Sequence, residues 1–203
     1  MVEITKNEME VLNLYRKNIF LEATILEIMK RLNKKSYQRV YEAVKKLEKS
    51  KIFRIDKFGK SSRVKLNLSE ETIVYFSYLE EKEALSREIP NIRRIMDMKE
   101  FQEDIILITG SYAKGKQAKN SDIDLVVITK EKEVEKQKLL DRTTSLLTPE
   151  FHNIVINYED FLGMLKAKEE NFGKEIFKNH KILRNSGRYF HLLKEAIENG
   201  FRN

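Results

Sequence analysis

Apolar residues recur at helical spacing over the first fifty positions of the chain. Between 21 and 32 the apolar positions are Leu21, Ile25, Ile28, Met29 and Leu32. This spacing predicts a helix with one buried stripe. After a polar break at 33–35, Ser36 is a good N-cap for a second helix. That helix is expected to bury Tyr37, Val40, Val44 and Leu47. An earlier helix, over about 6–17, completes a small helical core.

An alternating pattern follows these helices. The segments IFRIDKF (52–58) and RVKLNL (63–68) are typical of two strands joined by the turn GKSS, because strand side chains alternate between faces. Two helices joined by a short turn form a helix-turn-helix pattern. A hairpin directly after the second helix has the position of a wing. Residues 1–68 therefore resemble a winged helix-turn-helix domain.

Charge separates this first third from the rest of the chain. Residues 1–68 hold 17 Lys and Arg against 8 Asp and Glu, a net of +9, whereas 69–203 hold 22 against 24, a net of −2. A basic segment joined to a near-neutral one indicates a polyanion-binding module, and DNA is the leading partner. The expected DNA-binding residues lie on the second helix and at the hairpin tip: Ser36, Gln38, Arg39, Lys45, Lys60 and Arg63. Winged helices also bind proteins, and lysine-rich faces are often simply solvated.

A linking region, 69–100, is expected between two domains. The stretch 69–90 predicts one long helix from about 70 to 88, with Ser69 as a possible N-cap and Pro90 beyond its end. Its apolar residues concentrate in the first half. They pack either against the first domain or against a second copy in a homodimer. A shorter helix around 91–100 leads into the second domain, 101–203.

Two apolar strands flank a glycine-containing turn in the middle of the chain. DIILIT (104–109) predicts a buried strand that runs directly into Gly110 and Ser111. Glycine permits the close approach of a phosphate, and serine adds a hydroxyl. Asp122 and Asp124 belong to the second strand and project from the same face, because strand side chains alternate. Two carboxylates beside a phosphate cradle predict a magnesium site.

The stretch GSYAKGKQAKNSDIDL (110–125) is similar to the GSxARG and SDIDL motifs of the minimal nucleotidyltransferase domain, a branch of the DNA polymerase beta-like superfamily. The resemblance covers about 100–165. It implies an α/β (α+β) fold with a mixed sheet flanked by helices. The nucleotide-binding residues that it implies are Gly110, Ser111, Lys114 and Ser121. It makes Asp122 and Asp124 the catalytic ligands of Mg²⁺ or Mn²⁺. Lys114 stands where the family usually has arginine, and a point cation still serves a phosphate.

Active members of this family carry a third carboxylate on a neighbouring strand. In this chain the candidate strand is FHNIVIN (151–157), and Asn153 is the residue expected to face the pocket. Asparagine can coordinate a metal through its carbonyl oxygen but cannot accept a proton from the acceptor. The acids near this strand, in predicted turns or helix starts, are Glu150, Glu159 and Asp160. A third carboxylate is therefore not evident.

Further helices are expected over 131–147, 158–170, 171–180 and 187–198. The histidines His152, His180 and His191 have no spacing that suggests a shared metal site. The chain contains no cysteine, which fits a reducing interior. It has no apolar run of membrane-spanning or signal-peptide length. The expectation is a cytoplasmic protein with no membrane partner.

The resemblance implies transfer of a nucleoside monophosphate from a nucleoside triphosphate, with ATP the first candidate, to an acceptor hydroxyl. The acceptor is a protein side chain or a small molecule. An alternative is a transcriptional regulator whose nucleotidyltransferase-like domain senses nucleotide or mediates assembly without catalysis. A protein-interaction scaffold is a third reading.

Overall fold

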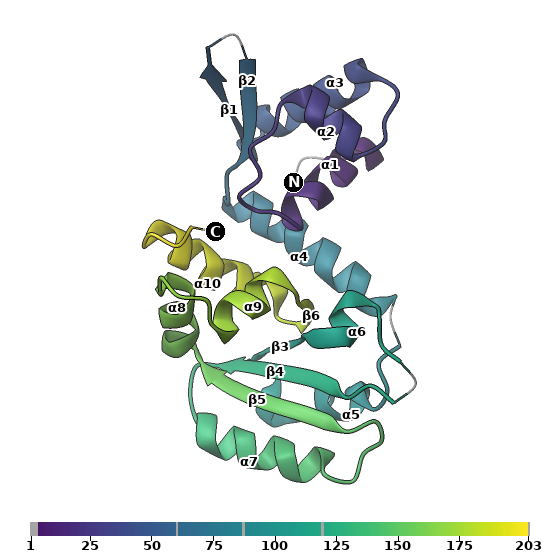
Figure 1. The fold of residues 1–203 in the computed structure, drawn as a ribbon, viewed down its shortest axis with the longest axis vertical. Coiled ribbons are helices and arrows are strands. Elements are labelled where there is room, and N and C mark those ends of the chain that lie inside the picture. The colour runs from purple at the N-terminus through teal and green to yellow at the C-terminus, as the bar shows by residue number, and fades with distance from the viewer. Residues whose placement is uncertain (1–3, 60, 87, 119, 203) are drawn as a thin grey trace. The chain divides into compact units, whose positions relative to one another are not determined.

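The computed structural model describes residues 4–59, 61–86, 88–118 and 120–202. They form two units that divide between Phe76 and Ser77, inside helix α4 (Glu70–Leu85) (Figure 1). The division falls within the predicted linking region. Two sheets lie in the described part of the chain, one of two strands and one of four. The mixed α/β (α+β) fold class is confirmed.

Unit 1 contains helices followed by an antiparallel hairpin. The helices are α1 (Lys6–Arg16), α2 (Ile25–Arg31) and α3 (Tyr37–Lys49), and the strands are β1 (Phe53–Phe58) and β2 (Ser61–Leu66). Thr5 and Thr24 open α1 and α2 with capping boxes. The Ser36 hydroxyl accepts a hydrogen bond from the Arg39 N–H at the start of α3, so the predicted N-cap is confirmed.

The hairpin is tied to the helices through Val64. The buried Tyr15 hydroxyl donates a 2.9 Å hydrogen bond to the Val64 carbonyl, and Val64 also forms a β-bridge with Ala23. Burial raises the pKa of Tyr15, because the charged phenolate is disfavoured away from water. The hairpin and the helices therefore share one core.

Three expectations for unit 1 were wrong. The second strand of the hairpin spans Ser61–Leu66 rather than 63–68, so Ser61 and Ser62 of the expected turn belong to the strand. Helix α2 begins at Ile25 rather than near 21, because Thr24 caps it there. Tyr37 is 48% exposed rather than buried. It is the first residue of α3, and its ring stacks with that of Tyr41, with 6.3 Å between centroids. The core stripe of α3 is formed by Val40, Ala43, Val44 and Leu47.

Unit 2 is built on a mixed sheet with the order β5-β4-β3-β6. Its strands are β3 (Ile105–Ile108), β4 (Ile123–Thr129), β5 (Phe151–Asn157) and β6 (Lys181–Arg184). Strand β3 pairs antiparallel with β4 and β6, whereas β4 and β5 are parallel. The parallel pair requires a crossover, and helix α7 (Glu133–Thr144) supplies it. The sequence did not predict β6, which has only four residues and two apolar positions.

Helices cover both faces of this sheet. They are α5 (Ile92–Met96), α6 (Gly110–Lys114), α7 (Glu133–Thr144), α8 (Tyr158–Lys166), α9 (Phe172–Lys178) and α10 (Ser186–Glu198), with a 3₁₀ helix η1 (Lys99–Phe101). Figure 1 shows α7 on one side of the sheet and α9 and α10 on the other. Leu140 of α7 and Ile95 of α5 pack in one buried cluster with alternate residues of β3 and β4. Among the described residues, no helix is both long and apolar enough to cross a membrane.

Several predicted boundaries shift. The long helix ends at Leu85 rather than near 88, and the helix expected over 91–100 is divided into α5 and η1. Helices α7, α8 and α9 are each shorter than their predicted ranges. Strand β5 matches its predicted range.

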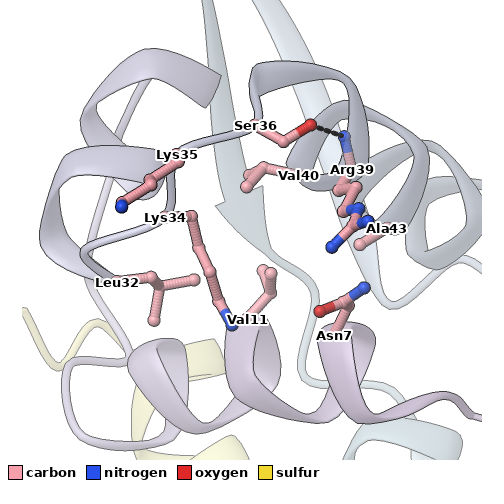
Figure 2. Close-up of a pocket in the computed structure, with 9 residues that line it drawn as sticks. All are labelled: Asn7, Val11, Leu32, Lys34, Lys35, Ser36, Arg39, Val40 and Ala43. Carbon is pink, nitrogen blue, oxygen red and sulfur yellow. Dashed lines mark hydrogen bonds between the residues drawn. The ribbon is translucent and has the colours of Figure 1, made fainter.

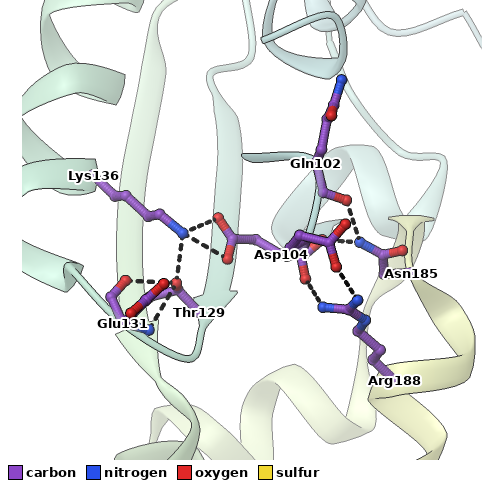
Figure 3. A network of polar contacts seen from close by, with 8 residues as sticks. Gln102, Asp104, Thr129, Glu131, Lys136, Asn185 and Arg188 are labelled. Atoms are coloured by element: carbon purple, nitrogen blue, oxygen red, sulfur yellow. Dashed lines mark hydrogen bonds and ion pairs between the residues drawn. The ribbon is translucent and has the colours of Figure 1, made fainter. Parts of the chain in front are cut away.

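A buried polar network fixes the start of β3 against the end of β4 (Figure 3). The Lys136 ammonium lies 2.8 and 2.7 Å from the two carboxylate oxygens of Asp104 and 2.9 Å from the Thr129 hydroxyl. The Asn185 amide donates to the Asp104 carbonyl at 2.7 Å. These contacts hold the N-terminal end of β3 against the C-terminal end of β4. The opposite ends of the same two strands meet at Gly110 and Asp124.

Candidate active site

The end of β3 and the start of β4 meet at Gly110. The Thr109 N–H donates a 2.9 Å hydrogen bond to the Asp124 carbonyl, which brings the next residue, Gly110, against Asp124. Gly110 has φ +62°, and a Cβ there would lie 1.9 Å from Asp124 Oδ2. Only glycine combines the left-handed backbone with this close approach. The Asp124 carboxylate therefore faces the turn.

Asp122 and Asp124 share one side of the sheet with a residue from β5. In the parallel register, Asp124 is paired with His152. His152 Nδ1 lies 3.6 Å from Asp124 Oδ1, and its Nε2 lies 3.8 Å from Asp122 Oδ2. These separations are longer than hydrogen bonds. One imidazole thus lies beside both carboxylates, although Asp122 itself precedes β4 by one residue.

The site is open to solvent. The side chains of Asp122, Asp124 and His152 are 46%, 40% and 56% exposed. Outside residues 1–3, 60, 87, 119 and 203, no Lys or Arg forms an ion pair with either aspartate. The carboxylates are therefore available to a ligand from solution.

The donor chemistry suits Mg²⁺ or Mn²⁺. Carboxylate oxygens are the preferred protein ligands of these hard cations, and Mg²⁺ usually retains several waters. A half-exposed pair of carboxylates leaves room for water and phosphate oxygens. Within the described chain, no group of three or more His, Cys, Asp and Glu side chains is arranged to hold a metal. The two carboxylates therefore fit a metal site in which the nucleotide phosphates and water supply the remaining ligands, rather than a site formed by protein side chains alone.

The other predicted nucleotide-binding residues lie around the same turn. Ser111 and Lys114 belong to α6, the short helix that begins at Gly110. The Ser121 hydroxyl accepts a 2.8 Å hydrogen bond from the Ala118 N–H, so it closes the loop before β4. The Asn179 amide, after α9, donates to the Gly110 carbonyl at 3.4 Å. No local sequence pattern predicts that contact, because 69 residues separate the two partners.

The expectation that Asn153 faces the pocket was wrong. Its amide donates to Asp141 Oδ1 at 3.0 Å and to the Thr144 hydroxyl at 2.7 Å. Both partners belong to α7, on the opposite side of the sheet from Asp124. Strand alternation explains the result: if His152 stands beside Asp124, residue 153 must point the other way.

Three acidic residues near β5 could in principle supply a third carboxylate. Glu150 contributes its backbone carbonyl to the sheet by accepting a hydrogen bond from the Ile123 N–H. Asp160 accepts one from the Asn157 amide at the start of α8. Glu159 lies in the first turn of the same helix. In the part of the chain that the structure describes, none of them is grouped with the two aspartates into a metal cluster. On the neighbouring strand β5, the residue beside the two aspartates is His152.

Residues 91–188 match the family model described as "Polymerase beta, Nucleotidyltransferase". This match supports the nucleotidyltransferase superfamily. It covers just under half of the chain and includes Gly110, both aspartates and His152. The motif resemblance over the same stretch is thereby supported. Comparisons with curated proteins and with solved structures gave no match.

The predicted DNA-binding residues belong to unit 1, outside the nucleotidyltransferase match. Gln38 donates to Glu42 at 2.8 Å, and Lys45 pairs with Glu48 at 2.6 Å, both along the exposed face of α3. Arg63 is an exposed residue of β2. Lys60 lies outside the described residues. Helix α3 and β2 thus carry the described candidates, together with Ser36 and Arg39 at the start of α3.

Proposed function

We propose that this chain is a metal-dependent nucleotidyltransferase coupled to a DNA-binding winged helix-turn-helix domain. In the proposed reaction an acceptor hydroxyl attacks the α-phosphate of a nucleoside triphosphate, with ATP the first candidate. The bond between the α- and β-phosphates breaks, the nucleoside monophosphate is transferred to the hydroxyl oxygen, and pyrophosphate and the hydroxyl proton are released. The observation that supports it most is the Asp124 carboxylate packed against Gly110, with Asp122 on the same side and no lysine or arginine partner among the described residues.

Asp122 and Asp124 would hold Mg²⁺ or Mn²⁺. When bound, the metal would neutralise negative charge on the α-phosphate and would stabilise both the attacking and the leaving oxygen. Gly110 lets the Asp124 carboxylate lie against the turn, and the triphosphate would bind at this same turn. In this proposal the Ser111 hydroxyl donates to a phosphate oxygen, and Lys114 adds a cation on the same short helix.

His152 is the residue on the neighbouring strand. Its ring lies within 4 Å of both carboxylates and more than half of the side chain is exposed. A ring nitrogen in this place can hydrogen-bond an acceptor hydroxyl and hold it beside the aspartates. In this proposal His152 orients the acceptor hydroxyl. Active members of the family have an acidic residue on the neighbouring strand instead.

Unit 1 supplies the DNA contacts in this proposal. Its support is the net charge of +9 over residues 1–68 and the exposed face of α3, which carries Gln38, Lys45 and the stacked rings of Tyr37 and Tyr41. Helix α3 would enter the major groove and the hairpin would contact phosphates. A homodimer, whose paired domains would read paired half-sites, stays a prediction. Analytical ultracentrifugation would test it by measuring the mass of the protein in solution.

A transfer assay tests the enzymatic proposal. The whole chain is incubated with Mg²⁺ and ATP labelled at either the α- or the γ-phosphate, with candidate protein acceptors present. Nucleotidyl transfer moves only the α label. We expect Asp122→Ala and Asp124→Ala to abolish transfer, whereas Asp141→Asn, a carboxylate on the opposite side of the sheet, retains it. Transfer that survives in both alanine variants would rule out this site.

A second candidate is a transcriptional regulator that senses nucleotide without chemistry. It is favoured by the imidazole that stands in place of a third acid and by the lack of a three-ligand cluster among the described side chains. It predicts saturable ATP binding that changes affinity for a DNA duplex, with no label transfer. The same α-labelled ATP experiment, run with a duplex-binding measurement, separates the two candidates.

A further inference from the structure

A cavity of about 120 Å³ lies inside unit 1 (Figure 2). It is enclosed by α1, by the turn between α2 and α3, and by the first two turns of α3. Its apolar wall is formed by Val11, Leu32, Val40 and Ala43. A fully apolar cavity of about 150 Å³ is large enough to bind benzene. At about 120 Å³ this cavity is slightly smaller, and it has room for one aromatic ring with the polar end of the ligand at the cavity edge.

The edge of the cavity is positively charged. Lys34, Lys35 and Arg39 all line it. Lys34 forms an ion pair with Glu10. In the described part of unit 1, the side chains of Lys35 and Arg39 have no hydrogen-bond or ion-pair partner. Figure 2 shows the Arg39 guanidinium turned toward Asn7 at the edge of the pocket. Two cations thus remain uncompensated there.

Ser36 adds a hydroxyl at the same edge. Its oxygen accepts the Arg39 N–H as the N-cap of α3. A hydroxyl also has one hydrogen to donate, and the described contacts give that hydrogen no acceptor inside unit 1. The cavity therefore combines an apolar wall, a guanidinium and a hydroxyl donor.

We propose that this cavity binds a small organic monoanion, with its carboxylate at Arg39 and Ser36 and its apolar body against Val11, Leu32 and Val40. A guanidinium pairs with a carboxylate through two parallel hydrogen bonds. Inorganic phosphate fits less well, because its remaining charged oxygens would face apolar side chains without partners. A neutral ligand of the same size leaves the two cations uncompensated.

Binding of the anion would also affect DNA affinity, an inference that rests on the proposed DNA-binding function. Ser36 and Arg39 are also expected DNA contacts. A carboxylate bound to both withdraws them from DNA phosphates, so occupancy of the cavity lowers affinity for a duplex. The small anion would then act as an effector of DNA binding.

Amide chemical shifts of the whole protein, titrated with benzoate, test the site without DNA. We expect saturable shifts at Val11, Ser36 and Arg39, and binding of benzamide, the neutral counterpart, that is weaker by about tenfold. Arg39→Gln and the surface change Lys35→Gln each weaken benzoate binding and reduce the preference over benzamide. Lys17→Gln removes an exposed charge at the C-cap of α1 that does not line the cavity, and leaves binding unchanged.

Four results of the titration would overturn the site. They are no saturable shift, equal binding of benzamide, equal binding of inorganic phosphate, or shifts at these residues with a DNA duplex but not with benzoate. The link to DNA is tested separately by duplex affinity with and without benzoate. If benzoate binds but duplex affinity is unchanged, the effector role is wrong. If no duplex binds under any condition, the proposed DNA function fails while the titration still decides the site.

Discussion

Asp104 and Asp124 lie at opposite ends of the paired strands β3 and β4, in contrasting surroundings. Asp104 is buried, and both of its carboxylate oxygens are bound by Lys136 (Figure 3). Asp124 is partly exposed, lies against Gly110, and has no lysine or arginine partner among the described residues. A buried carboxylate needs its own cation to remain charged. An open pair of carboxylates can instead accept a cation from solution.

The same contrast separates two neighbours on β5. Asn153 is held on the α7 side by Asp141 and Thr144, whereas His152 stands beside Asp122 and Asp124. One face of the strand is used for packing α7 onto the sheet. The other is left open beside the turn at Gly110. The face of the strand on which a side chain lies, more than its residue type, thus separates the polar groups that pack α7 onto the sheet from those left open to solvent.

The largest effect on stability is expected for Lys136→Met. Removing the ammonium leaves Asp104 buried without a partner, which should lower the free energy of unfolding of unit 2 by about 3 kcal/mol. Hydrogen exchange of the β3 and β4 amides measures this loss. Lys138→Met, at an exposed position of the same helix, should change it by less than about 0.5 kcal/mol. Equal effects of the two variants would show that the Asp104 network is not structural.

Gly110→Ala should lower transfer activity by about 100-fold, because displacement of a catalytic group by roughly 1 Å can have that effect. The added Cβ would meet Asp124 Oδ2 at 1.9 Å, so the carboxylate must move. Gly59→Ala is the matched control: its φ of +57° is similar to the +62° of Gly110, but nothing lies within 4 Å of the added Cβ. Both variants carry a backbone cost of about 1 kcal/mol. Only Gly110→Ala should lose activity in the labelled-ATP assay.

His152→Ala and Asn153→Ala compare the two faces of β5. His152→Ala should lower transfer by about tenfold while stability is kept, since only the orientation of the acceptor is lost. Asn153→Ala should lower the free energy of unfolding by about 1–2 kcal/mol, because two hydrogen bonds to α7 are removed, with transfer unchanged. Activity and urea denaturation are measured on both variants. The reverse pattern would mean that the acceptor is bound on the α7 side.

Local chemistry made much of this fold predictable from the sequence. Ser36 was recognisable as an N-cap from its residue type, and the apolar run of β5 gave both of its ends. The turn at Gly110 and the aspartates that follow it were readable because the motif is contiguous. These features depend on residues within a few positions of one another.

The rest depends on partners that are distant in the sequence. The position of His152 follows from the parallel register of β4 and β5, which the strand patterns alone do not fix. A polar residue inside an apolar strand predicts a pocket-facing Asn153, yet its hydrogen-bond partners lie on α7. Strand β6 gains its identity from pairing with β3 rather than from its own four residues. Tyr37 has the same helical spacing as the apolar stripe of α3, but its ring stacks with that of Tyr41 instead of entering the core.

Manganese binding is the most direct test of the claim that the open aspartates form a metal site. Mn²⁺ is titrated into the wild-type protein, Asp124→Asn and Asp141→Asn in the presence of ATP, and free Mn²⁺ is measured by electron paramagnetic resonance. The account predicts at least about tenfold weaker binding in Asp124→Asn, which loses a charged ligand, and no change in Asp141→Asn. Equal binding by all three proteins would contradict it.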